Sequence, residues 1–250
     1  MGEAVSGKRP TGDVQDGQSS GGHMEAPTVP RSTNPDQTAS TAPAARRPIA
    51  SRSAAWAQSM AGYLAERSVT PNQISQSSLV FAALACLSFC FSVWFDTPGF
   101  LVIAAIFIQM RLIANLMDGL VAVEGGKGTA DGGFWNEVPD RPADVLILAG
   151  AGVAAGSLTL GLVAGIGALV TAYIRAMSTS LGGPDDFCGP MAKQHRMAVV
   201  TGAAVIGAVE ASMSGTQVAM ISGLLIIILG TGVTALRRSR RLLGHLNQRS

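Results

Sequence analysis

The sequence predicts an all-α membrane protein in which six transmembrane helices follow one interfacial helix. Three observations predict this fold class: 48% of the 250 residues are hydrophobic, only 14% are charged, and the mean hydropathy is +0.34. Soluble domains are normally more polar, so these values place the chain among membrane proteins. The net charge of +2 says little by itself, and we expect no nucleic-acid partner.

The N-terminal part contains two segments before the first predicted span. Residues 1–48 are rich in Ser, Thr, Pro, Gly, Asp and Gln, so we expect a disordered cytoplasmic tail. Residues 49–67 are expected to form an interfacial amphipathic helix. Its large residues recur at helical spacing; they are Trp56, Met60, Tyr63 and Leu64. Thr70-Pro71-Asn72 can then cap the next helix.

Six apolar segments follow within residues 68–236. They are Ile74–Trp94, Gly99–Val123, Val138–Ala155, Leu158–Leu181, Met197–Ser212 and Gln217–Leu236. Most approach the roughly 20 residues that a helix needs to cross the hydrocarbon core, while the third and fifth are short or polar at one end. Gly and Ala are frequent in these segments, and small residues let helices approach closely inside a bilayer.

The basic residues outside the spans lie on one side of this arrangement. Six spans place both termini on the same side of the membrane. The loops and ends on that side include Lys127, Lys193, Arg196 and the basic cytoplasmic tail 237–250. The opposite loops contain no Lys or Arg, which is the positive-inside pattern. We therefore expect a multi-pass protein of the inner (cell) membrane with both termini in the cytoplasm.

A polar cluster joins the second apolar segment to the third, on the predicted cytoplasmic side. One helical face is expected to carry Arg111, Asn115, Asp118 and Ala122. A second face, at the start of the next helix, is expected to carry Asn136, Asp140 and Asp144, which repeat every four residues. Converging carboxylates repel one another unless a cation lies between them. Oxygen ligands of this kind suit a hard divalent ion.

This spacing resembles the pattern of the CDP-alcohol phosphatidyltransferase family, D-x2-D-G-x2-A-R-x8-G-x3-D-x3-D. The matching residues are Asp118, Gly119, Ala122, Gly132 and Asp140. Asn115, Val123 and Asn136 depart from the pattern, because the family has Asp, Arg and Asp there. The resemblance covers residues 68–236 and implies a six-helix domain, commonly a homodimer, with a polar cavity open to the cytoplasm.

The resemblance also implies an activity and a set of site residues. The family transfers a substituted phosphate from a CDP-linked alcohol, usually CDP-diacylglycerol, to an acceptor hydroxyl and releases CMP. The implied Mg²⁺ or Mn²⁺ ligands are Asn115, Asp118, Asn136 and Asp140, with Asp144 as a further candidate. The implied CDP site comprises Asp118, Gly119, Ala122 and Gly132. Asp140 is the implied general base, and Lys127 or Arg111 would replace the charge of the missing arginine.

A second polar group follows the fourth apolar segment. Tyr173-Ile174-Arg175-Ala176 and the later Lys193 and Arg196 resemble the family segment that lies near a phosphorylated acceptor. A charged residue such as Arg175 in an apolar segment marks a functional candidate. The three cations could bind the acceptor or, alternatively, anionic lipid headgroups. The sequence leaves the acceptor open among glycerol 3-phosphate, inositol phosphate, and a small amino alcohol or polyol.

Three other functions stay open at this point. The chain could be a weak or inactive relative that binds a nucleotide lipid, a membrane transporter, or a structural membrane scaffold. Release of labelled CMP separates an enzyme from all three. Movement of substrate into sealed vesicles without CMP release would favour the transporter, although no internal repeat is evident in the sequence.

Overall fold

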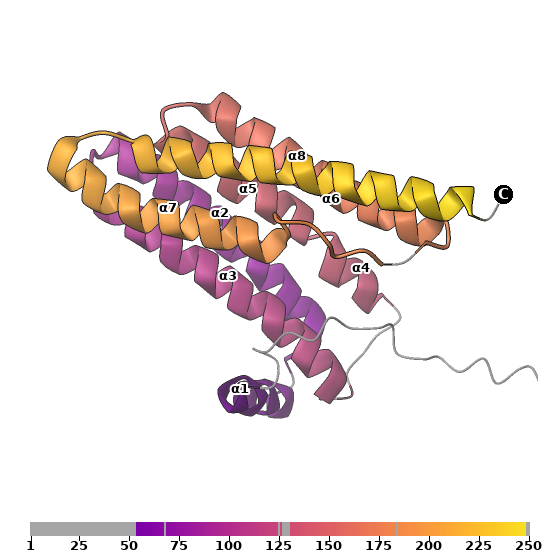
Figure 1. Ribbon diagram of the computed structural model, residues 1–250. Helices are drawn as coiled ribbons and strands as arrows, with labels where there is room; N and C mark the ends of the chain where they lie inside the picture. The colour runs from indigo at the N-terminus through magenta and orange to yellow at the C-terminus, as the bar shows by residue number, and fades with distance from the viewer. Residues whose placement is uncertain (1–53, 68, 125, 127–130, 184, 249–250) are drawn as a thin grey trace, which may run out of the picture. The chain divides into compact units, whose positions relative to one another are not determined.

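The computed structural model describes residues 54–67, 69–124, 126, 131–183 and 185–248. All regular structure in these residues is α-helical, as the sequence predicts (Figure 1). The helices are α1 Ala55–Glu66, α2 Pro71–Trp94, α3 Gly99–Glu124, α4 Gly132–Glu137, α5 Asp140–Ala154, α6 Leu158–Ser180, α7 Lys193–Ser214 and α8 Val218–Asn247. The predicted tail 1–48 and the first residues of the predicted interfacial helix lie outside the described residues.

Five helices, α2, α3, α6, α7 and α8, are long and apolar enough to cross a membrane. The third predicted span, Val138–Ala155, falls short because it contains only the 15-residue helix α5. At 1.5 Å per residue α5 is about 22 Å long, against a hydrocarbon core of roughly 30 Å. Pro139, which has no N–H, precedes α5, and Gly156 follows it with a φ of 71°. The described residues therefore supply five such helices where the sequence predicts six.

Helix α5 lies between α2 and α6 and forms part of the core. Its Ile147, Leu148 and Ala151 are fully buried. A Cβ atom on Gly161 of α6 would lie 2.4 Å from the Leu148 carbonyl oxygen, and one on Gly152 would lie 2.7 Å from the Gly161 Cα. The expectation that small residues allow close helix approach is confirmed at this contact.

Helix α1 packs on the C-terminal half of α3 through its smallest side chains. Ala57 and Ala61 are buried in a cluster with Ala114, Met117 and other residues of α2 and α3. Of the large residues of the predicted interfacial face, Trp56, Met60 and Tyr63 are exposed, whereas Leu64 packs against this cluster. The predicted face thus leaves three of its four large side chains exposed.

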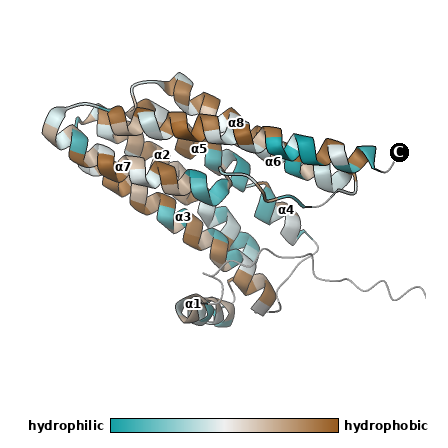
Figure 2. Ribbon diagram, in the orientation of Figure 1, coloured by the Kyte–Doolittle hydropathy of each residue, from teal (hydrophilic) through white to brown (hydrophobic). Residues whose placement is uncertain are grey.

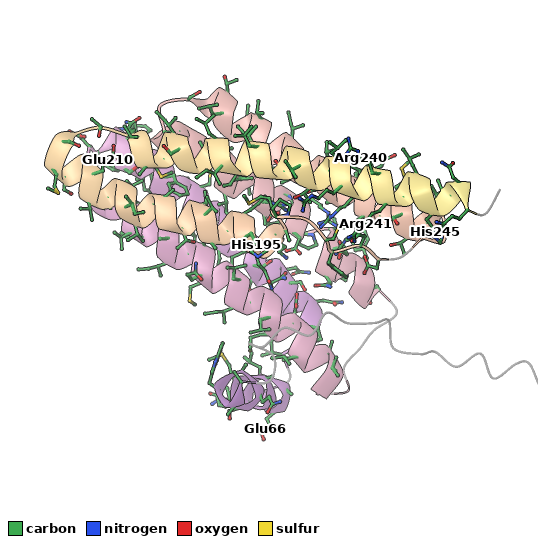
Figure 3. All side chains as sticks on the ribbon, viewed as in Figure 1. Glu66, His195, Glu210, Arg240, Arg241 and His245 are labelled. Atoms are coloured by element: carbon green, nitrogen blue, oxygen red, sulfur yellow. The ribbon has the colours of Figure 1, made fainter. Side chains whose placement is uncertain are left out.

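Helix α8 continues past Leu236, where the predicted span ends, and reaches Asn247. The predicted basic tail is therefore helical up to Asn247. Hydrophilic residues gather in this part of α8, in α4 and at the start of α7, all towards one end of the described helices (Figure 2). At the other end, Glu210 of α7 accepts hydrogen bonds from the backbone N–H groups of Val218 and Ala219 and so caps α8 (Figure 3).

Candidate functional site

Helix α3 carries the first part of the candidate site on its inner face. Arg111 is fully buried, Asp118 is 3% exposed, and Asn115 between them is half-buried. The Ser75 hydroxyl of α2 donates a 2.7 Å hydrogen bond to Asp118 Oδ2. Asp118 Oδ1 is buried and has no hydrogen-bond partner among the described residues. This leaves one carboxylate oxygen of Asp118 able to accept from, or coordinate, a ligand.

The prediction that Asn136, Asp140 and Asp144 share one helical face is wrong for Asn136. Helix α4 ends at Glu137 and α5 begins at Asp140, because Pro139 interrupts the run of helical hydrogen bonds. Asp140 and Asp144 are buried on α5, whereas Asn136 is exposed on α4. Of the α4 residues, Glu137 is the one that faces the cations of the site.

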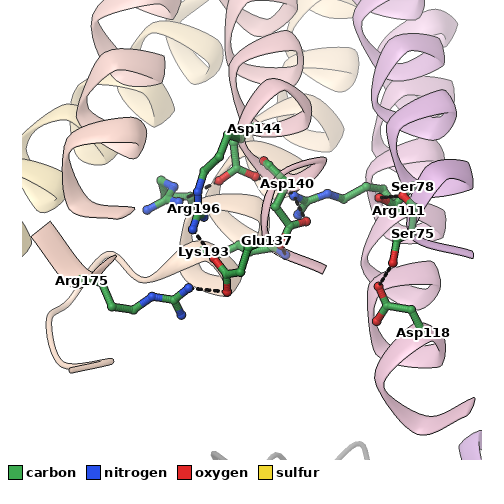
Figure 4. A network of polar contacts seen from close by, with 11 residues as sticks. Ser75, Ser78, Arg111, Asp118, Glu137, Asp140, Asp144, Arg175, Lys193 and Arg196 are labelled. Carbon is green, nitrogen blue, oxygen red and sulfur yellow. Dashed lines mark hydrogen bonds and ion pairs between the residues drawn. The ribbon is translucent and has the colours of Figure 1, made fainter. Parts of the chain in front are cut away.

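Three cations bind the two α5 carboxylates (Figure 4). Arg111 Nη2 lies 2.9 Å from Asp140 Oδ1 and 2.8 Å from Asp144 Oδ1, so it bridges the two residues. Lys193 Nζ donates to Asp140 Oδ2. Arg196 Nη2 lies 2.8 Å from Asp144 Oδ2. All four carboxylate oxygens are therefore occupied by side chains from α3 and α7.

A second, more exposed set of charges lies around Glu137. Its carboxylate accepts from Arg141 and from Arg175 of α6. Burial is the largest single influence and would raise the pKa of Glu137, but the charge and hydrogen bond of Arg175, together with the charges of Arg141 and Lys193, outweigh it and lower that pKa below the usual value. The Arg175 guanidinium also lies 4.9 Å from the centre of the Phe187 ring, in the α6–α7 loop.

The two predicted groups of polar residues therefore meet in space. Arg175, Lys193 and Arg196 lie beside the acidic cluster, but each is paired with a different carboxylate. Only Arg175 and Lys193 retain exposed side-chain surface, at 18% and 23%, against 4% for Arg196. Arg196 also donates to the Met191 carbonyl oxygen at 3.1 Å and is thus held from several directions.

The remaining predicted residues occupy the ends of α3 and α4. Gly119 and Ala122 are half-buried on α3, and Gly132 is half-buried at the start of α4. Val123 is 50% exposed. Lys127, a candidate replacement for the missing arginine, lies outside the described residues.

Sequence reasoning missed several residues that shape the site. Ser75 is one, because a serine near the start of a helix is uninformative without its partner. Arg238 of α8 is another; it donates to the Cys188 carbonyl oxygen at 3.0 Å and the Thr171 carbonyl oxygen at 2.8 Å, and so ties the α6–α7 loop to α6 and α8. Its position in a basic run made it resemble an ordinary tail residue.

The donor atoms of the site suit a divalent ion only in part. Asp118 Oδ1 is a buried oxygen without a partner among the described residues, and Asn115 lies one turn away on the same helix. Side-chain oxygens are the type of ligand that a hard cation prefers, although these two residues supply only part of a coordination shell. Asp140 and Asp144 already bind cations. Within the described ranges, no group of three or more His, Cys, Asp or Glu side chains could hold a metal ion.

The sequence matches no protein-family model and no curated protein. Two solved structures of phosphatidylinositol phosphate synthase (PgsA1) from Mycobacterium tuberculosis share its fold. The first has CDP-DAG bound; it is 20% identical, has a TM-score of 0.61, and the match covers 76% of this chain and 94% of that chain. The second is a complex with manganese and citrate; it is 20% identical, has a TM-score of 0.62, and the match covers 75% and 88%.

Proposed function

We propose that this chain is a CDP-alcohol phosphatidyltransferase. It would transfer a substituted phosphate from CDP-diacylglycerol or a related CDP-alcohol to an acceptor hydroxyl and release CMP, in phospholipid biosynthesis. The observation that carries the proposal is the position of Asp140, a residue of the sequence pattern, between Arg111 of α3 and Lys193 of α7. The shared fold with a protein solved with CDP-DAG bound supports this class of donor.

Asp140 is the proposed general base of the reaction. Arg111 holds Oδ1 from the buried side, so Oδ2 faces the more exposed Lys193. The carboxylate takes the proton of the acceptor hydroxyl. The acceptor oxygen then bonds to the phosphorus that carries the lipid alcohol. The bond from that phosphorus to the CMP oxygen breaks, and CMP leaves with the electron pair.

The donor nucleotide is assigned to the ends of α3 and α4. Gly119, Ala122 and Gly132 have little or no side chain, so a nucleotide could lie close to the helix backbone. Asp118, with Asn115, is the proposed place for Mg²⁺ or Mn²⁺. When bound, such an ion supplies positive charge to the pyrophosphate and to the departing CMP.

The acceptor is assigned to the side of Asp140 where Lys193 and Arg175 lie. Both cations keep exposed surface and can exchange a carboxylate partner for an anionic group of the acceptor. This favours a phosphorylated acceptor such as glycerol 3-phosphate. Arg196 is nearly inaccessible, so we assign it to holding Asp144 in place.

The chain is proposed to be a multi-pass protein of the inner (cell) membrane, with both termini and this site facing the cytoplasm. The support is that hydrophilic residues gather at the end of the described helices where the site lies (Figure 2). His195, Arg240 and Arg241 lie towards this end as well (Figure 3). Assembly as a homodimer remains a prediction from the family resemblance.

A second candidate is a relative that binds a CDP-lipid without turnover. Asn115, Asn136 and Val123 favour it, since all three remove a charge that the family pattern has. An assay of CMP release distinguishes the transferase from the binding protein. It contains purified full-length protein, CDP-diacylglycerol labelled in the cytidine, and a phosphorylated acceptor. Acceptor-dependent CMP release that Asp140→Asn lacks supports the transferase. Tight lipid binding without CMP release supports the second candidate.

A further inference from the structure

We infer that the ammonium group of Lys193 takes the place of a divalent ion at Asp140. The site then holds at most one divalent ion, at Asp118. The consequence for catalysis rests on the proposed function, whereas the number of bound ions does not. The inference concerns the inner cluster, defined here as Arg111, Asp118, Asp140, Asp144, Lys193 and Arg196.

The first support is the occupancy of Asp140. Arg111 takes Oδ1 and Lys193 takes Oδ2, so an ion could bind this carboxylate only by displacing one of them. Arg111 is fully buried and is also bound to Asp144, which fixes its position. Lys193 would have to leave, and an ammonium group in contact with the carboxylate repels an approaching divalent ion.

The second support is the charge balance of the inner cluster. The cluster contains three carboxylates and three cations, so its side chains are neutral together without any added ion. All three cations pair with Asp140 and Asp144, while Asp118 accepts from Ser75. A buried excess of positive charge is costly unless it is paired. An aspartate at position 115, one turn from Asp118 on α3, would add a negative charge that a divalent ion would neutralise. The asparagine that stands there instead agrees with a site whose cations are already present.

The third support comes from buried groups without partners. Three buried donors have no hydrogen-bond partner among the described residues: Arg111 Nε, Arg111 Nη1 and Arg196 Nε. The corresponding buried acceptor of the cluster is Asp118 Oδ1. The cluster thus has more unused donors than acceptors, which favours an added anion over a second cation. The remaining acceptor at Asp118 accounts for one ion, whose charge the pyrophosphate of a CDP-lipid would balance.

Titration with Mn²⁺ tests this inference, with the loss of the free-ion electron paramagnetic resonance signal as the readout. Full-length protein in detergent is measured with and without CDP-diacylglycerol. We expect at most one Mn²⁺ per chain, bound more tightly when the lipid is present. Asp118→Asn should remove this binding, and Asp140→Asn should leave the number of ions unchanged.

Lys193→Met removes the ammonium but keeps a side chain of similar length, and Lys193→Arg is its matched control. Lys193→Met should bind an additional Mn²⁺, or bind Mn²⁺ at least about tenfold more tightly, because a like charge is gone. Lys193→Arg should bind Mn²⁺ as the wild type does. Thermal unfolding and CDP-lipid binding confirm that each variant is folded.

Two results would overturn the inference. One is wild-type protein that binds two ions per chain, and the other is Lys193→Met with unchanged binding. CMP release, measured in the same samples, reports on the proposed function separately. A single bound ion without CMP release would leave the inference standing and contradict the transferase. CMP release with two bound ions would support the transferase and contradict the inference.

Discussion

Asp140 is the residue at which the parts of the site meet. It is the first residue of α5, Arg111 reaches it from α3, and Lys193 reaches it from α7. It is only 6% exposed, so water competes little for its carboxylate. The contacts of this side chain bring together acidic and basic groups that lie far apart in the sequence.

Replacement of Asp140 by Asn should reduce transfer by about 10² to 10⁴, the range typical of a lost general base. The amide cannot accept the proton of the acceptor hydroxyl but has nearly the same shape. Initial rates of CMP release measure the effect, and retained CDP-lipid binding serves as the control. Near wild-type turnover would show that another group is the base.

Arg175 and Glu137 give a matched pair of changes at the acceptor side. Arg175→Ala should raise the KM for a phosphorylated acceptor about tenfold to a hundredfold, since a lost charged hydrogen bond costs roughly 1.5–3 kcal/mol. Glu137→Gln should lower the same KM, because the acceptor no longer competes with this carboxylate for Arg175. The KM for the CDP-lipid should change little in both. Equal changes for both substrates would indicate a structural role instead.

Single residues show where sequence reasoning reaches its limit. The helical spacing correctly placed Arg111 and Asp118 on a buried face of α3. It could not show that Arg111 bridges Asp140 and Asp144, because that depends on how far α5 lies from α3. The partner of Ser75 was equally hidden, since the two residues of that hydrogen bond are 43 positions apart.

At the scale of elements, the main difference between prediction and structure is the segment 132–154. Hydropathy indicated one span from Val138 to Ala155, but the structure contains the short α4, a break before Asp140, and α5. The break turns Asn136 outward and brings Glu137 to the cations. A proline near a helix start is compatible with either arrangement, so the sequence alone did not decide between them.

The contact of α5 with α6 sets the position of the site, because α5 carries both inner carboxylates. Gly161→Ala places a Cβ against the Leu148 carbonyl oxygen, and backbone there has to shift. We expect a loss of about 1–3 kcal/mol in stability, measured as a lower thermal unfolding temperature in detergent. Gly202→Ala on α7 is the control, since nothing lies within 4 Å of its added Cβ, and it should unfold near the wild-type temperature. Equal unfolding temperatures for the two variants would contradict this packing.

At the scale of the whole molecule, composition predicted the all-helical membrane fold well. Hydropathy located α2, α3, α6, α7 and α8, because each is long and apolar enough to be recognised alone. Helix α8 continues past Leu236, where the predicted apolar span ends, since the arginines after Leu236 end the apolar pattern but not the helix. Helix propensity continues through that basic run, and Arg238 packs inward.

The proposed orientation in the membrane is tested by cysteine labelling of intact cells. The three cysteines, Cys86, Cys90 and Cys188, are free in the structure and can be replaced first. A cysteine at Phe187 should react only after the cells are opened, and one at Thr216, beyond the other end of α7, should react from outside. Labelling of position 187 from outside would contradict a cytoplasmic site.

Mass spectrometry of lipids tests the proposed reaction most directly. Purified protein is incubated with CDP-diacylglycerol, Mg²⁺ or Mn²⁺, and a set of acceptors that includes glycerol 3-phosphate, inositol phosphate, an amino alcohol and a polyol. We predict one new phospholipid with the mass of a phosphatidyl group joined to a phosphorylated acceptor, formed in equal amount to CMP and strongly reduced with Asp140→Asn. CDP-diacylglycerol that stays intact with every acceptor, or CMP release that yields only phosphatidic acid, would contradict the proposed transfer.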